Sequence, residues 1–154
     1  SRVHFTGPLP YAQYLKLIQS SSVHVYLTRP FVLSWSMIEA MSTGCLVLGS
    51  DTPPVREVIR NGENGLLVDF FDSKKIAKRI SEVLDSKDRM MQLRTKARET
   101  ALENYSQARL LPQHIKLIQD VANRSLPLNN LEISPPNITA TKPSKKSKGF
   151  ASLL

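Results

Sequence analysis

A serine and a glutamate near the start of a short helical stretch are the residues whose types and spacing point most directly to chemistry. In the stretch SMIEAMSTGCLVLGSD, residues 36–51, Glu39 follows Ser36 by three positions. Ser36 and Glu39 match the capping box, in which the glutamate accepts a hydrogen bond from a backbone N–H. A carboxylate at this place can instead accept hydrogen bonds from the hydroxyl groups of a ligand. The spacing leaves both interpretations open.

The start of the same helix offers backbone N–H groups to an anion. The pattern predicts a helix over residues 34–42, and Gly44 is a typical residue just beyond a helix end. The free N–H groups and the dipole of a helix favour a phosphate at its first turn, here near Ser34 to Ser36. If Glu39 binds a ligand, that ligand is therefore expected to carry a phosphate as well as hydroxyl groups.

A sheet must position these residues. Apolar segments at residues 3–5, 23–27, 45–49 and 65–68 are predicted strands, with helices between them. The first of these helices has a face at helical spacing, made of Tyr11, Tyr14, Leu15 and Ile18. A further helix is predicted after the third strand, with Thr52 as its cap, Pro53 at its first position and Asn61-Gly62 at its end. Strands and helices that alternate with short connections predict an α/β fold with a doubly wound parallel sheet.

Ligands of such sheets bind beyond the carboxyl ends of the strands. Arg29 and Arg56 are charged candidates for a phosphate contact at those ends. Trp35 is expected to pack in the core, and lining the cleft is its alternative role. His4, His24 and His114 lack the spacing of metal ligands, so no metal site is predicted.

The second half of the chain has apolar residues at helical spacing up to about residue 125, and beyond it no such pattern. Asp72 is expected to cap a helix, a second helix is predicted from about Lys87 to Asn104, and a third starts near Ser106. Pro112 should delay the start of this third helix or kink it. Residues 1–125 are therefore predicted as a folded domain, and residues 126–154, rich in Pro, Ser and Lys, as a disordered tail.

Composition and charge restrict the classes of partner. The 154 residues carry a net charge of +8 and one cysteine, Cys45, which excludes an internal disulfide. The basic residues are expected on solvated helix faces, with contact to anionic lipid as the alternative. Specific nucleic-acid binding is not expected, because no aromatic stacking platform accompanies the charge. No apolar run is long enough to cross a bilayer, and we expect a cytoplasmic protein, with peripheral membrane contact as the alternative.

Four ordered motifs resemble a known enzyme family. The segments IEAM, STGCLVLGS, REVI and NGENGLLV occur in this order, and VHFTGPLP precedes them. The sequence over about residues 3–85 is similar to the donor-binding region of retaining glycosyltransferases of family 4, also called group 1. This resemblance implies the C-terminal half of a GT-B fold, with a Rossmann-like sheet, and a role in carbohydrate biosynthesis.

The resemblance also implies roles for individual residues. Glu39 would accept hydrogen bonds from the ribose of a nucleotide sugar, and the backbone N–H groups of Ser34, Trp35 and Ser36 would hold its diphosphate. The nucleobase would lie against Gly7, Pro8 and Leu9, and the loop of Ser50, Asp51 and Thr52 would line the cleft.

One position departs from the family pattern. The family has a first glutamate eight positions before Glu39, where this sequence has Phe31. In the family that carboxylate helps to position the donor sugar, so sugar recognition or activity could differ here. A subfamily with its own loop and an inactive protein are the two interpretations.

The expected function is transfer of a sugar from a nucleotide sugar to an acceptor hydroxyl, with retained configuration and without a metal or other cofactor. The acceptor would be a sugar, a polysaccharide or a lipid. The family's acceptor-binding domain and its Arg/Lys loop have no counterpart in this sequence, so we expect the 154 residues alone to be inactive. The rival hypotheses are a truncated, non-catalytic Rossmann-like binding module and a sugar-nucleotide epimerase. An epimerase would need acid/base residues in the cleft, which the sequence does not show.

Overall fold

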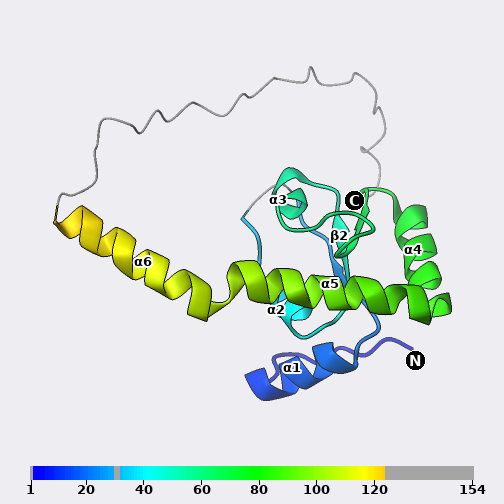
Figure 1. Ribbon diagram of the computed structural model, residues 1–154. Coiled ribbons are helices and arrows are strands. Elements are labelled where there is room, and N and C mark those ends of the chain that lie inside the picture. The colour runs from blue at the N-terminus through cyan, green and yellow to red at the C-terminus, as the bar shows by residue number, and fades with distance from the viewer. Residues whose placement is uncertain (1, 30–31, 124–154) are drawn as a thin grey trace, which may run out of the picture. The chain divides into compact units, whose positions relative to one another are not determined.

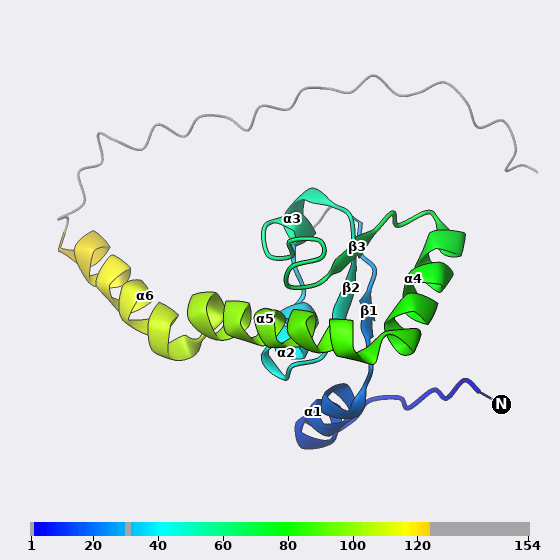
Figure 2. The same cartoon turned by 45° about the vertical axis from the view of Figure 1, so that its right-hand side comes forward.

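The computed structural model describes residues 2–29 and 32–123. A parallel sheet of three strands has the order β1-β2-β3 (Figure 2). Its strands are β1 (His24–Tyr26), β2 (Val47–Ser50) and β3 (Leu66–Val68). The described residues also form six helices: α1 (Tyr11–Ser20), α2 (Trp35–Ser42), α3 (Pro53–Arg56), α4 (Ser73–Asp85), α5 (Lys87–Tyr105) and α6 (Gln107–Ala122).

Both faces of the sheet are covered, as the run of consecutive apolar residues in its central strand predicts. Val47 belongs to one hydrophobic cluster, which includes residues of α1, α2 and α5. Leu46 and Leu48 belong to a second cluster with residues of β3, α4 and α5. Because neighbouring residues of a strand point to opposite faces, each face has its own core. The predicted α/β fold with a doubly wound parallel sheet is confirmed.

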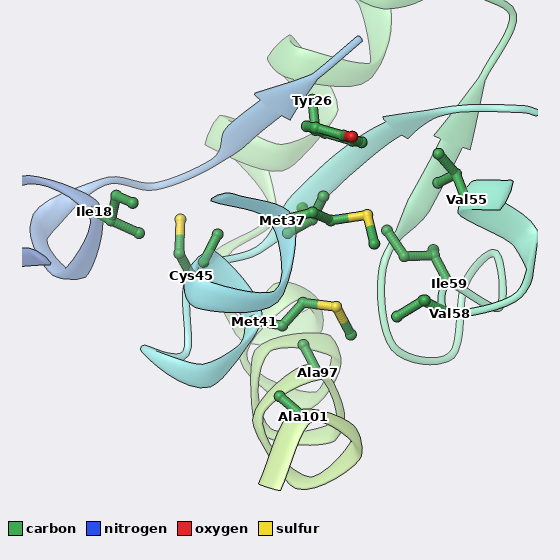
Figure 3. Packing of buried hydrophobic residues seen from close by; sticks show 12 residues of the cluster. Ile18, Tyr26, Met37, Met41, Cys45, Val55, Val58, Ile59, Ala97 and Ala101 are labelled. Atoms are coloured by element: carbon green, nitrogen blue, oxygen red, sulfur yellow. The ribbon is translucent and has the colours of Figure 1, made fainter. Parts of the chain in front are cut away.

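The first cluster fixes α2 in place. Figure 3 shows Met37 and Met41 of α2 at the centre of this cluster, with Ala97 and Ala101 of α5 nearby. Both methionines and Ala97 are fully buried. The small alanine side chains let the two helices approach closely, and α5 runs along α2 (Figure 1).

Two arginines of α5 anchor the C-terminal end of α2. The Nε of Arg94 donates to the carbonyl oxygen of Gly44 over 2.7 Å, and Arg98 donates to that of Ser42. Gly44 has a φ of +77°, the left-handed conformation that commonly follows a helix end. The Arg98 contact satisfies one of the carbonyl groups that a helix leaves free at its end, and the Arg94 contact holds the turn that follows. The opposite, N-terminal end of α2 follows the carboxyl end of β1, which is the edge where ligands of parallel sheets bind.

The predicted first strand is wrong. Residues 3–5 form no strand with any described residue, and the side chains of Val3 and Phe5 are 64% and 97% exposed. The segment is apolar at Val3 and Phe5, but a strand also needs a surface on which its side chains can pack. The described sheet therefore has three strands instead of the predicted four.

Two helices differ from prediction at their ends. The helix after β2 is shorter than predicted: α3 ends at Arg56, and the hydroxyl of its N-cap Thr52 makes no capping hydrogen bond. The helix that contains Pro112 begins at Gln107, so the proline lies inside α6. The predicted cap of α4 is confirmed, because a carboxylate oxygen of Asp72 accepts from the N–H of Lys75 over 2.9 Å.

The described part of the chain falls into two compact units. The first comprises Ser1–Leu117, and the second comprises Ile118–Leu154, of which residues 118–123 are described. The predicted boundary near residue 125 and the predicted disordered tail, residues 126–154, lie outside the described residues.

Candidate functional site

Glu39 does not cap its helix. The N-cap of α2 is Ser34, whose Oγ accepts from the N–H of Ser36 over 3.3 Å. The Glu39 carboxylate instead accepts from two phenol hydroxyls of α1: Tyr11 donates to Oε1 and Tyr14 to Oε2, each over 3.1 Å. The capping-box interpretation is therefore wrong. The N-cap is Ser34 and not Ser36, and the Glu39 carboxylate points toward α1.

The pKa values of both tyrosines rise beside Glu39. Partial burial, with the hydrogen bond to Glu39 as a second cause, raises the pKa of Tyr14 to about 12. For Tyr11 the hydrogen bond to Glu39 is the main cause of a raised pKa. Both phenols thus remain protonated donors at neutral pH. Sequence reasoning placed them on one helix face and missed this role; the signal was that both positions are tyrosine instead of leucine or phenylalanine.

The N-terminal end of α2 presents Trp35 to solvent. The Trp35 side chain is 82% exposed, so the expectation that it packs in the core is wrong. The N–H of Ser34 donates to the buried Tyr26 hydroxyl over 2.9 Å, which ties the helix start to β1. Within the described residues, the N–H of Trp35 has no acceptor and is available to an anion. Phe31, at the position of the family's first glutamate, lies outside the described residues.

Ser50 at the end of β2 and Thr52 in the loop that follows are both buried. Ser50 is fully buried, and its hydroxyl accepts from the N–H of Thr28 over 3.0 Å and donates to the carbonyl of Thr28 over 2.7 Å. The hydroxyl therefore connects the end of β2 to the loop after β1. Thr52 is also buried, and its Oγ1 has no hydrogen-bond partner within the described residues.

Asp51 of the same loop is exposed and paired. Its Oδ1 lies 2.5 Å from Nε of Arg56, and this hydrogen bond lowers the pKa of Asp51. Both residues line a surface cavity of about 420 Å³ at the carboxyl ends of the strands, together with Arg29, Thr52, Asp69, Phe70 and Phe71. Because the Nε of Arg56 already donates to Asp51, Arg56 is less available to bind a phosphate than the sequence predicted. Arg29 lines the same cavity.

The predicted nucleobase loop lies beside the tyrosines. Gly7 has a φ of +62°, a conformation that favours glycine, and it turns the chain toward α1. Gly7 and Leu9 line a second cavity of about 430 Å³ together with Tyr11 and Tyr14, whereas Pro8 is exposed. The structure thus brings Gly7 and Leu9 close to the partners of Glu39.

Two further features of the described residues concern metals and membranes. No group of three or more His, Cys, Asp or Glu is placed there to hold a metal ion. Nor does any helix in that part of the chain combine the length and apolar character that crossing a bilayer requires.

Comparison with known proteins decides the family. The family model for glycosyl transferases group 1 matches residues 1–100. This chain belongs to the group 1 glycosyltransferases. The "Putative glycosyltransferase EpsD" of Bacillus subtilis (strain 168) is 32% identical over 98 residues, which are 64% of this chain and 26% of EpsD.

Solved structures agree on the fold of this glycosyltransferase domain. The C-terminal domain of a group 1 glycosyl transferase, LpcC from Francisella tularensis, aligns with a TM-score of 0.59 and 17% identity, over 68% of this chain and 52% of that chain. Anabaena HepE in complex with UDP aligns with a TM-score of 0.65 and 18% identity, over 68% of this chain and 29% of HepE. The chain has the fold of the C-terminal domain of GT-B enzymes. It spans 26–31% of the length of the curated relatives that it matches.

Proposed function

We propose that this chain forms the donor-binding part of a retaining glycosyltransferase and that Glu39 binds the ribose of a nucleotide sugar. One observation carries this proposal: the Glu39 carboxylate lies on α2, near the carboxyl end of β1, and is held by hydroxyl donors. A carboxylate that already accepts from two O–H groups is suited to accept from the two hydroxyls of a ribose.

The remaining parts of the nucleotide follow from this assignment. The diphosphate is placed at the start of α2, near Ser34, Trp35 and Ser36, where a helix N-terminus favours negative charge. The nucleobase is placed against Gly7, Pro8 and Leu9, which the groove shared with Tyr11 and Tyr14 supports. The loop of Ser50, Asp51 and Thr52 lines the cleft, with Ser50 acting through the loop's shape because its hydroxyl bonds to Thr28.

The chemistry of the whole protein is transfer of the sugar to an acceptor hydroxyl. The bond between the anomeric carbon and the diphosphate oxygen breaks, a bond to the acceptor oxygen forms on the same face, and the acceptor proton is lost. Positioning of the donor and neutralisation of the departing diphosphate supply most of the rate. We propose a metal-independent reaction in the cytoplasm, with a sugar, polysaccharide or lipid acceptor, and with peripheral contact with a membrane as the alternative. Because the chain spans 26–31% of its curated relatives, these 154 residues alone are expected to be inactive.

A non-catalytic binding module is the second candidate. Phe31 replaces the family's first glutamate, and a side chain without a carboxylate cannot hold a sugar hydroxyl in the same way. A longer protein containing this chain separates the candidates: release of nucleoside diphosphate that depends on an acceptor supports the enzyme. Donor binding without turnover, with the family's acceptors present, supports the binding module.

The site is tested by mapping where a nucleoside diphosphate binds. We would titrate UDP, the ligand present in the HepE structure, into the ¹⁵N-labelled 154-residue chain and follow the backbone amide signals. Saturable shifts of residues 7–9, 34–36 and Glu39 are expected. Shifts confined to the cavity lined by Glu57, Glu63, Lys96 and Glu99, or no saturable shift at millimolar UDP, GDP and ADP, would contradict the proposal.

A further inference from the structure

Two tyrosines one turn apart hold opposite sides of one carboxylate. Tyr11 and Tyr14 are three positions apart on α1, and their ring centroids are 6.1 Å apart. Each hydroxyl donates to a different oxygen of Glu39 over 3.1 Å. Together the two donors hold the carboxylate against α1. Each oxygen can accept a further hydrogen bond, so the carboxylate is not saturated.

The two tyrosines differ in how firmly they are held. Tyr14 is half-buried and packs against the hydrophobic cluster that contains Ile18 and Met37. A partly buried hydroxyl that loses its partner pays the cost of desolvation, so the Tyr14 contact is costly to break. Tyr11 is 61% exposed, and its hydroxyl can exchange Glu39 for water at little cost. The raised pKa of Tyr14, about 12, is consistent with a donor that remains protonated beside the carboxylate.

The two phenols offer the same hydrogen bonds as a vicinal diol. A ribose presents two O–H donors on neighbouring carbons, and the two phenol O–H groups donate to the two carboxylate oxygens in the same way. A diol that approaches from the solvent side meets the exposed Tyr11 first. We propose that Tyr14 is a positioning residue that orients Glu39 for the ribose diol, and that Tyr11 is the exchangeable partner which the diol displaces. This inference rests on the proposed role of Glu39.

The two roles predict opposite effects of two matched substitutions. Tyr14→Phe keeps the ring and removes the hydroxyl that orients Glu39, so recognition of the diol should weaken. Tyr11→Phe removes the hydroxyl that competes with the diol, so recognition should be kept or become slightly tighter. Tyr105→Phe is the control: Tyr105 is a half-buried tyrosine at the end of α5 that packs against the same cluster.

The measurement compares binding of a ribose nucleotide with binding of its 2′-deoxy counterpart. A loss of folding stability would weaken the binding of both nucleotides alike, whereas a loss of diol recognition would weaken only the binding of the ribose nucleotide. Trp35 is the sole tryptophan of the chain, and its fluorescence would report binding at the start of α2. UDP, GDP and ADP are each titrated with their 2′-deoxy counterparts into the full 154-residue chain, and the pair that binds most tightly is used. The discrimination is the ratio of the 2′-deoxy dissociation constant to the ribose one.

We expect a ratio of roughly 10 for the wild type and for Tyr105→Phe, which corresponds to about 1.4 kcal/mol for the hydrogen bond that the 2′-deoxy ligand lacks. Tyr14→Phe should lower the ratio to about 3 or less, whereas Tyr11→Phe should keep it. A wild-type ratio in Tyr14→Phe, or an equal loss in Tyr11→Phe, overturns the inference. Glu39→Gln separates this failure from that of the proposed function. If Glu39→Gln keeps the wild-type ratio of dissociation constants, Glu39 does not bind the ribose diol and the proposed function is wrong. If Glu39→Gln loses this ratio while Tyr14→Phe keeps it, only the proposed role of Tyr14 is wrong.

Discussion

Glu39 shows that the neighbours of a side chain decide its role. Its position three residues after Ser36 fitted a helix cap, but Ser34 is the cap and the carboxylate meets two phenols of α1. Those phenols come from residues 25 and 28 positions earlier in the chain. Sequence spacing reports neighbours within one helix, whereas this contact depends on how α1 packs against α2. The site residues could be proposed from the family's motifs, and the hydrogen bonds that orient them could not.

The contact between Tyr14 and Glu39 can be tested by titration. Burial is the main cause of the raised pKa of Tyr14, and the hydrogen bond to Glu39 is the second. In Glu39→Gln the charge is lost, so the pKa should fall from about 12 toward 10 but remain above it. The ¹³Cζ signal of Tyr14, followed by NMR as pH rises, measures this. An unchanged pKa would show that the phenol does not contact the carboxylate.

The same shift has a consequence for stability. The folded state keeps the Tyr14 proton to a higher pH than the unfolded state, so the unfolded state binds fewer protons between pH 10 and about 12. The contribution of this group to the free energy of unfolding is fully present below pH 10 and is lost as pH rises through that window.

Asn64 is a buried polar residue with a structural role. It is 3% exposed; its Oδ1 accepts from the N–H of Arg60 over 2.7 Å, and its Nδ2 donates to the carbonyl of Val58 over 3.0 Å. Asn64→Ala leaves these two backbone groups without a partner, so the free energy of unfolding should fall by about 2–3 kcal/mol. Urea unfolding measures this. Asn104→Ala, an exposed asparagine of α5, is the control and should cost less than about 0.5 kcal/mol.

At the scale of elements, α2 depends on the close approach of α5. Ala97 is fully buried in the cluster that contains Met37 and Met41. Ala97→Leu inserts a larger side chain into this packed region and should lower the free energy of unfolding by about 1–3 kcal/mol. The exposed Ala108 of α6 provides the control, since Ala108→Leu should change the free energy of unfolding by less than about 0.5 kcal/mol. Equal effects of the two substitutions in urea unfolding would contradict the described packing.

The elements differ in how well the sequence predicts them. The strand at 45–49 was predictable because its consecutive apolar residues fit a strand buried on both faces, and the structure places β2 at Val47–Ser50. The cap at Asp72 was predictable because it is a local contact. Residues 3–5 form an apolar segment but no strand within the described residues, and the side chains of Val3 and Phe5 are exposed, because local sequence does not specify whether a surface is available for packing.

At the scale of the whole molecule, the family and the fold are established and the reaction is a proposal. The α/β fold and the group 1 membership follow from ordered motifs spread over some 80 residues, which is why they could be predicted from the sequence. The tail beyond residue 125 and Phe31 lie outside the described residues, and the chain spans 26–31% of its curated relatives. The central claim is therefore one of binding: a nucleoside diphosphate binds at the start of α2, with its ribose on Glu39.

The most direct test is the affinity of Glu39→Gln for a nucleoside diphosphate. We would titrate the tightest of UDP, GDP and ADP into the wild-type chain, Glu39→Gln and Glu57→Gln, and follow Trp35 fluorescence. Glu57 is exposed and lies in a different cavity, so it is the control. We predict a dissociation constant at least about tenfold higher for Glu39→Gln and unchanged for Glu57→Gln, as expected when a charged acceptor of hydrogen bonds is lost. Equal affinities of Glu39→Gln and the wild type would contradict the assignment of Glu39 as the ribose ligand.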